Sequence, residues 1–203
     1  FIRHGWIERN RILKPNEGSQ YIKVPLKKYS LSTRINDIQI NNSDDWRDRL
    51  FRQLEHYKKR APFYEETICV VKEALSIETE SIVKLNKNII LTVCKYLGID
   101  VRIDVFSEMN LRVEEANKPD DWALNICKAI GNINEYWNPE GGLGFFDRAK
   151  YIDAGIDIWF LKIEMDEYSQ SRRNFEVGLS IIDVMMFNTV EEINNMLDNF
   201  KKL

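Results

Sequence analysis

The chain has 203 residues, an apolar content of 44% and a formal net charge of -3. This length supports a single domain with a sizeable core, and the composition is that of a globular protein rather than a disordered one. A slightly acidic chain without a recognised binding signature argues against nucleic acid as a partner, and no apolar run reaches the roughly 20 residues of a membrane span.

Positive charge is concentrated near the start of the chain. Residues 1–60 hold 14 Lys and Arg against 7 Asp and Glu, whereas the remainder holds 15 against 25. A basic segment on an acidic body favours an anionic ligand for the first part of the chain. The alternative is a solvated basic face that pairs with the acidic part.

The cysteines and histidines do not form a metal-binding pattern. Cys69, Cys94 and Cys127 are far apart and lie in apolar helical patterns, and His4 and His56 are the two histidines. No CxxC pair exists, so we expect no metal site and no cofactor. An odd number of separated cysteines fits a reducing, cytoplasmic location better than a secreted disulfide scaffold.

The first half of the chain predicts strands followed by helices. Alternation of apolar and polar residues predicts two strands, over residues 20–26 and 35–40. Helical periodicity then predicts three helices, over residues 44–60, 64–75 and 79–97. Ser43 is expected to cap the first helix and Gly98 to end the third.

In the second half of the chain, predicted strands alternate with predicted helices. The predicted strands cover residues 101–106, 133–137 and 156–163. The predicted helices cover residues 121–130, 146–154, 179–186 and 190–200. Short connections between them favour a single α/β domain over residues 1–203, with a largely parallel sheet flanked by helices and a helical C-terminus.

Three loops follow predicted strands directly: residues 107–108, 138–144 and 164–170. In an open parallel sheet, ligands bind beyond the carboxyl ends of the strands. The sequence therefore predicts a three-sided site built from these loops.

The segment 5–13 places an aromatic ring, an amide and two guanidinium groups close together, in Trp6, Arg9, Asn10 and Arg11. Guanidinium groups suit phosphate or carboxylate, and in a strand Arg9 and Arg11 share one face. An arginine paired with an acidic residue is the alternative. Because the chain starts at Phe1, we expect part of this site and of the fold to lie upstream.

Three residues are candidates for acid–base chemistry. His56 titrates near neutral pH and suits a general base, although a surface or capping role is the alternative. Glu108, beside Ser107, would accept a hydrogen bond from a sugar hydroxyl or bind an ammonium group, unless it caps its loop. Asp183 lies in an apolar helix and needs either a basic partner from the N-terminal segment or a ligand.

The remaining candidates are expected to contact substrate. Asn138 and Gly141 belong to a glycine-rich turn that lacks the Gly-Lys-Ser/Thr of a phosphate loop. Its glycines would let a ligand approach the backbone closely, and a plain turn is the alternative explanation. Tyr168 would stack on a sugar or base, with core packing as the alternative. Asn188 would contact the ligand or end its helix.

Short motifs run in order along nearly the whole chain. They are Trp6 with Arg9-Asn10-Arg11, Val24-Pro25-Leu26, His56-Tyr57-Lys58-Lys59 with Ala61-Pro62-Phe63, Tyr96-Leu97-Gly98-Ile99, Ser107-Glu108, Ile126-Cys127-Lys128, Asn138-Pro139 with Gly141-Gly142, and Leu179-Ser180-Ile181-Ile182-Asp183 through Phe187-Asn188. Together they resemble the WbqC-like protein family. Two features depart from that family: Glu8 stands where Asn is usual, and its N-terminal strand with a Gln-Pro element and an aromatic-rich turn is absent.

The resemblance implies a bacterial protein of O-antigen (lipopolysaccharide) or other surface-polysaccharide assembly, in which transfer of glycine or a related acyl group onto a sugar has been proposed. We therefore expect a transferase acting on the amino group of a nucleotide-activated sugar. Arg9 and Arg11 would hold the diphosphate, and Glu108 or His56 would accept the proton. An acyl or aminoacyl carrier protein would dock on the basic segment 58–60.

Two other functions stay open at this stage. A glycosyltransferase of the same pathway is one, although the chain has no Asp-x-Asp metal motif. A non-catalytic scaffold for the assembly enzymes is the other. An enzyme should show a deep pocket where Arg9, Glu108 and Asp183 converge, whereas a scaffold should show a flat apolar patch.

Overall fold

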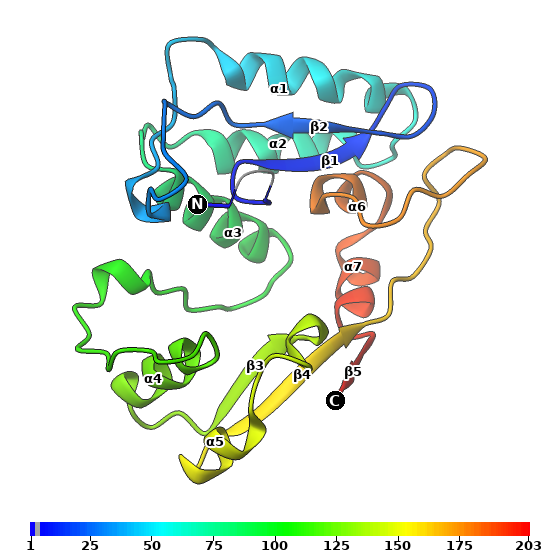
Figure 1. Ribbon diagram of the computed structural model, residues 1–203. Coiled ribbons are helices and arrows are strands. Elements are labelled where there is room, and N and C mark those ends of the chain that lie inside the picture. Colours follow the sequence, from blue (N-terminus) through cyan, green and yellow to red (C-terminus); the bar gives the residue numbers. More distant parts are fainter. Residues whose placement is uncertain (3–4) are drawn as a thin grey trace. The chain divides into compact units, whose positions relative to one another are not determined.

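The computed structural model describes residues 1–2 and 5–203, and the chain forms two compact units (Figure 1). Unit 1 comprises Phe1–Ile103 and Met165–Met196, and unit 2 comprises Asp104–Glu164 and Leu197–Leu203. The chain therefore leaves unit 1, builds most of unit 2, and returns to complete unit 1.

Unit 1 is a two-stranded hairpin packed on helices. Strands β1 (Arg9–Leu13) and β2 (Ser19–Lys23) pair antiparallel, with Arg9 opposite Lys23. The helices are α1 (Trp46–Leu54), α2 (Tyr64–Leu75), α3 (Ile82–Tyr96), α6 (Ile181–Phe187) and α7 (Val190–Leu197). Helix α1 packs on β2 and α6 packs on β1, so each strand of the hairpin has a helix against it (Figure 1).

Side-chain caps set where these helices begin. Asp45 accepts a hydrogen bond from the Asp48 amide at 2.9 Å, so α1 begins at Trp46 and Ser43 is not its cap. Ser81 caps α3 in the same way. Each cap satisfies a backbone N–H that has no partner within the helix.

The core of unit 1 joins the hairpin to the helix faces. The apolar face of α1 is buried, with Trp46 1%, Leu50 5% and Leu54 0% exposed. It packs with Ile12 and Leu13 of β1 in one cluster of buried residues. Apolar burial of this kind, rather than strand pairing in a large sheet, stabilises the hairpin.

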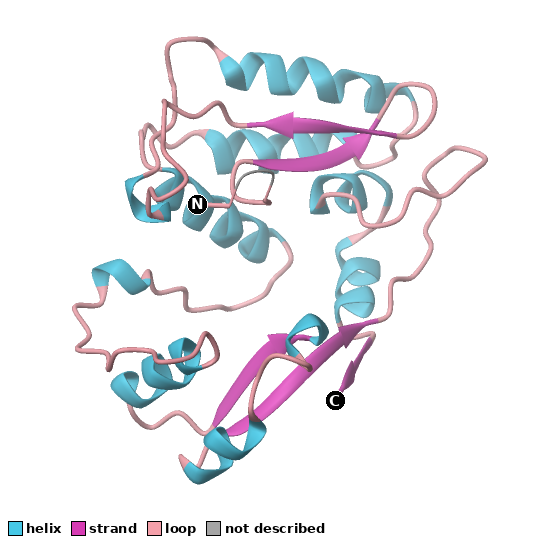
Figure 2. Ribbon diagram, in the orientation of Figure 1, coloured by secondary structure: helices cyan, strands magenta, loops and turns pink. Residues whose placement is uncertain are grey.

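Unit 2 holds a small mixed sheet, drawn in magenta in Figure 2. Strand β3 (Glu135–Pro139) is parallel to β4 (Asp157–Ile163), and β5 (Phe200–Lys202) pairs antiparallel with β4. The helices of this unit are α4 (Asp121–Ile130) and α5 (Arg148–Asp153).

The prediction of an α/β chain is confirmed, but that of a largely parallel sheet is wrong. Among the described strands one pair is parallel, in a three-stranded mixed sheet, and the other sheet is antiparallel. Residues 101–106 alternate in polarity but form no strand, because alternation needs a partner strand to become a ladder. The loop 107–108 therefore does not follow a strand, and only two of the three loops of the predicted site do.

Two further expectations are corrected. Residues 35–40 contain a 3₁₀ turn at Ile35–Asp37, followed by the isolated bridges Leu26↔Ile40 and Gln39↔Ser81. The C-terminus is not helical throughout, since α7 ends at Leu197 and β5 follows. In the part of the chain that the structure describes, no helix is both long enough and apolar enough to span a bilayer.

Candidate functional site

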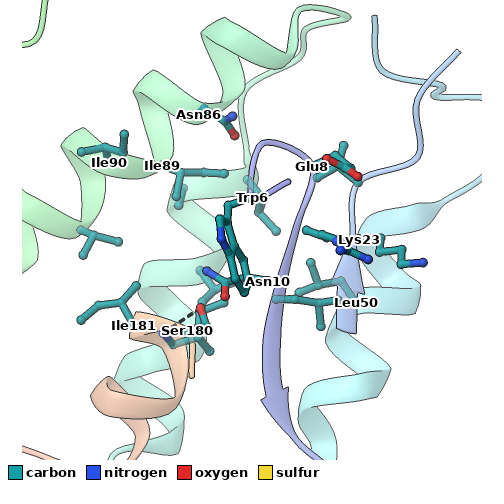
Figure 3. Close-up of a pocket in the computed structure, with 18 of the residues that line it drawn as sticks. Trp6, Glu8, Asn10, Lys23, Leu50, Asn86, Ile89, Ile90, Ser180 and Ile181 are labelled. Carbon is teal, nitrogen blue, oxygen red and sulfur yellow. Dashed lines mark hydrogen bonds between the residues drawn. The ribbon is translucent and has the colours of Figure 1, made fainter. Parts of the chain in front are cut away.

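Unit 1 contains a cavity of about 470 Å³ between the N-terminal segment, the hairpin and helices α2, α3 and α6 (Figure 3). Its volume falls in the range of roughly 300–1,000 Å³ that is usual for small-molecule sites. In Figure 3 the indole of Trp6 stands in the middle of the view and points toward Asn10. Trp6 itself is 64% exposed.

Apolar side chains from three helices form the floor of this cavity. They are Val70, Val71 and Ala74 of α2, Ile89, Ile90 and Val93 of α3, and Ile181, Ile182 and Met185 of α6. The polar residues are fewer: Glu8, Arg9, Asn10, Lys23, Asn86 and Ser180. An apolar floor with a few fixed polar groups is typical of a site for an amphipathic organic ligand.

Hydrogen bonds hold the polar groups of the cavity in place. The Asn10 side-chain oxygen accepts from the Arg11 amide at 2.8 Å, and the Asn86 amide donates to the Ile7 carbonyl at 3.0 Å. Ser180 accepts from the Ile182 amide and so caps α6, the contact drawn in Figure 3. These contacts fix Asn10 on β1 and tie the N-terminal segment to α3.

The two arginines of the N-terminal motif are used differently. Arg11 donates through Nη2 to the carbonyls of Val177 (3.0 Å) and Gly178 (3.1 Å), and it does not line the cavity. Arg9 does line the cavity, and its guanidinium carbon lies 4.3 Å from the ring centre of Tyr21. Arg11 therefore braces β1 to the segment before α6, while Arg9 lies at the cavity.

Asp183 is fully buried beneath the hairpin, and two tyrosines hold it. Tyr57 donates to Oδ1 at 2.5 Å, Tyr168 donates to Oδ2 at 2.6 Å, and Gln170 donates to Oδ2 at 3.3 Å. The Tyr57 hydroxyl also accepts from the Leu13 amide at 2.8 Å. The carboxyl thus links β1, the segment after α1, the loop before α6 and α6 itself.

Burial dominates the electrostatics of this cluster. It raises the pKa of Asp183, against the lowering effect of the hydrogen bonds from Tyr168 and Tyr57. Burial and the nearby Asp183 charge raise the pKa of both tyrosines, so their hydroxyls stay protonated donors. Asp183 and Tyr168 do not line the cavity, so the expected convergence of Arg9 with Asp183 in one pocket is not found.

His56 lies next to this cluster, with its ring 4.3 Å from that of Tyr57. Its Nδ1 is 2.8 Å from the Gln53 carbonyl, which can only accept, so Nδ1 carries the proton. Burial lowers the pKa of His56, and Arg172 and Arg60 lower it further. The imidazole is therefore neutral near pH 7, and its buried Nε2 has no hydrogen-bond partner among the described residues.

A second cavity of about 410 Å³ lies at the turn of the hairpin. Its lining is polar: Asn16, Glu17, Gly18, Arg60, Ser171, Arg172, Arg173, Asn174 and Glu176. Arg60 donates to the Pro15 carbonyl, and Arg172 donates to the carbonyls of Lys14 and Gly18. Two of these arginines therefore brace the turn.

The other candidates lie elsewhere. Ser107 and Glu108 are exposed on a 3₁₀ turn of unit 2. Asn138, also in unit 2, accepts from the Tyr136 hydroxyl, and Gly141 has open space around it. Asn188 is buried and donates to the Val184 carbonyl at the end of α6.

His4 lies outside the described residues. Among residues 1–2 and 5–203, no group of three or more His, Cys, Asp or Glu is arranged to hold a metal ion.

Four polar residues of the cavity are not among the site residues predicted from the sequence: Glu8, Lys23, Asn86 and Ser180. Asn86 interrupts the apolar stripe of α3 between Ile82 and Ile89, and a polar residue in such a stripe is a usable signal. Glu8 departs from a family pattern, and the sequence assigns it no role. Its position next to Arg9 and Asn10 is a usable signal for a cavity residue.

Comparison with known proteins agrees with the motifs. The model of the WbqC-like protein family matches residues 1–195. Uncharacterized protein Rv1507c of Mycobacterium tuberculosis (strain ATCC 25618 / H37Rv) is 26% identical over 200 residues, which is 97% of this chain and 83% of that protein. No solved structure matches the chain at a significant level. Since the family model spans nearly the whole length, the chain belongs to the WbqC-like protein family.

Proposed function

We propose that the protein is a transferase of bacterial surface-polysaccharide biosynthesis that moves a glycyl or other acyl group onto the amino group of a nucleotide-activated sugar. Its place in the WbqC-like family is consistent with an enzyme. The observation that carries the proposal is the 470 Å³ cavity of unit 1, with an apolar floor and fixed polar groups. A scaffold requires only a flat apolar patch, and a cavity of this volume favours a small-molecule substrate.

In this proposal the cavity holds the reacting end of the substrate. The apolar floor takes the acyl portion, and Trp6 and Asn10 contact the sugar. Arg9, at the cavity, supplies charge for the diphosphate, and Arg11 holds β1 in position. Lys58 and Lys59 are exposed, and we propose that they attract an acidic carrier protein that delivers the acyl group.

A thermal-shift screen tests the proposal. Nucleotide-linked amino sugars are compared with counterparts that carry a hydroxyl in place of the amine. A ligand at about 100 times its Kd stabilises the folded protein by roughly 2.7 kcal/mol, which raises Tm by several degrees. We expect this shift with the amino sugars. Equal shifts with both sets favour a glycosyltransferase, and no shift with either removes the nucleotide-sugar proposal.

A variant with a larger side chain in the cavity tests whether the nucleotide sugar binds there. Ile90 lines the cavity on α3 and is 49% exposed, so Ile90→Trp narrows the entrance without overpacking the core. We expect this variant to lose the ligand-induced shift. Leu31→Trp is the matched control, because Leu31 is also exposed, at 66%, and lies outside the cavity. A shift that survives in Ile90→Trp contradicts binding at this site.

A further inference from the structure

Glu8 carries a carboxylate oxygen for which the fold supplies no partner. Its Oε2 is buried and has no hydrogen-bond partner among the described residues. Glu8 lines the 470 Å³ cavity, and no other Asp or Glu is among the described residues that line it. Burying a charged oxygen without a donor is costly, so such a group in a cavity indicates a donor that arrives with a ligand.

The backbone on both sides of Glu8 is fixed. Its own carbonyl accepts from the Val24 amide at 2.8 Å, which continues the β1–β2 ladder by one step. The preceding carbonyl, that of Ile7, accepts from the Asn86 side chain at 3.0 Å. These two bonds place Glu8 at one end of the cavity, on the far side of Trp6 from Ser180 in the view of Figure 3. A fixed main chain limits where the carboxylate can lie when a ligand binds.

We infer that Glu8 binds the amino group of the ligand in this cavity and accepts its proton when the amine is acylated. This inference rests on the proposed function and assigns its proton acceptor. Neither earlier candidate for that role lines the cavity: His56 hydrogen-bonds the Gln53 carbonyl, and Glu108 belongs to unit 2. The other polar residues that line it are poorer acceptors: Asn10 and Asn86 are amides, Ser180 is a helix-capping hydroxyl, and the cationic groups of Arg9 and Lys23 only donate.

The step balances without an additional reactant. The amine nitrogen attacks the carbonyl carbon of the activated acyl donor, and a C–N bond forms. The bond from that carbon to the leaving group then breaks and the leaving group takes the electron pair. The nitrogen proton passes to Glu8 Oε2, which returns it to the leaving group or to water. Carboxylates that act as general bases in this way typically contribute about 10²–10⁴-fold in rate.

A binding experiment separates this role from activity. The probes are n-hexylamine and 1-hexanol, which share an apolar tail suited to the cavity floor and differ in the group offered to Glu8. Calorimetric titration of the wild-type protein should give about 10- to 100-fold tighter binding of the amine, the range expected for a hydrogen bond to a charged acceptor. In Glu8→Gln the preference should disappear, because the amide carries no charge.

Glu78→Gln is the matched control, since it removes the same charge from an exposed position of unit 1 outside the cavity. It should keep the wild-type preference for the amine. Glu8→Asp keeps the charge and should retain part of the preference, which guards against a folding defect in the Gln variant. Equal preference for the amine in wild type and Glu8→Gln would overturn the inference.

The transfer reaction distinguishes this inference from the proposed function. With an amino-sugar acceptor, Glu8→Gln should lower kcat by about 100-fold. An active enzyme whose kcat is unchanged in Glu8→Gln contradicts the role of Glu8 and leaves the proposed function standing. Amine preference without any nucleotide-sugar binding contradicts the proposed function instead.

Discussion

Replacing Asp183 by alanine is expected to lower the free energy of unfolding by about 3–5 kcal/mol. The substitution leaves the hydroxyls of Tyr57 and Tyr168 and the amide of Gln170 without their shared acceptor, inside a site where Asp183 is 0% exposed. Each buried donor left unsatisfied costs about 1–3 kcal/mol. The loss should appear as a lower midpoint of urea unfolding with the slope unchanged.

Two controls show whether the hydrogen bonds cause the loss. Asp44→Ala removes an exposed carboxylate from the same unit and should change stability by less than about 0.5 kcal/mol. Tyr168→Phe keeps the ring and removes one donor, so it should cost about 1–2 kcal/mol. If Asp183→Ala unfolds at the same urea concentration as Asp44→Ala, the cluster does not stabilise the fold.

The same carboxyl predicts how stability depends on pH. Because burial raises its pKa in the folded state above the ordinary value of about 4, the folded protein binds the proton more tightly than the unfolded chain does. Its contribution to stability is therefore full below about pH 4 and is lost as pH rises through the folded-state pKa. The stability of the wild type relative to Asp183→Asn should increase as pH is lowered from 7 to 4. A constant difference over that range contradicts the raised pKa.

Gly142→Ala is expected to destabilise unit 2 by about 3 kcal/mol, at the upper end of overpacking costs. A Cβ at Gly142 would lie 2.2 Å from Nδ2 of Asn138 and 3.0 Å from the rings of Phe146 and Phe160. Phe160 is fully buried, so its ring has no room to move aside. Hydrogen exchange of the β3 and β4 amides reports the stability of this unit.

Gly141 provides a matched control for this prediction. A Cβ at Gly141 meets no atom within 4 Å, so Gly141→Ala should change stability by less than about 0.5 kcal/mol. The two neighbouring glycines therefore have different uses, and the need for Gly142 is one of packing. Equal protection of β3 and β4 in both variants would refute that explanation.

Local signals predicted several helices well, although the interval 44–60 holds α1 followed by a 3₁₀ segment over Glu55–Lys59 rather than one helix. The intervals 64–75 and 121–130 coincide with α2 and α4, because apolar periodicity and end signals such as Gly131 act within a few residues. Strands were less predictable, since they depend on a partner far away in the chain. Residues 101–106 have the alternation but no partner strand, and β5 pairs with β4 although residues 190–200 read as one helix.

The candidate site was predictable in part, for the same reason. Trp6, Arg9 and Asn10 stand together in the sequence and meet at the cavity. The cavity floor, however, is formed by side chains of α2 and α3 that read as ordinary core. The hydrogen-bond partners of Asp183 could not be predicted from the sequence either. Tyr57 is 126 positions away, and Tyr168 lies in a loop without periodicity.

The discontinuous path of unit 1 has a consequence for how the protein emerges from the ribosome. The bond between Tyr57 and Asp183 spans 126 positions, and unit 2 lies almost entirely between them in the sequence. At about 5–20 residues per second, the ribosome needs roughly 6–25 s to make that intervening stretch. Once α2 and α3 have been made, they and the hairpin still lack α6 for the rest of this interval, so we expect the nascent chain to expose apolar surface of the kind that chaperones shield.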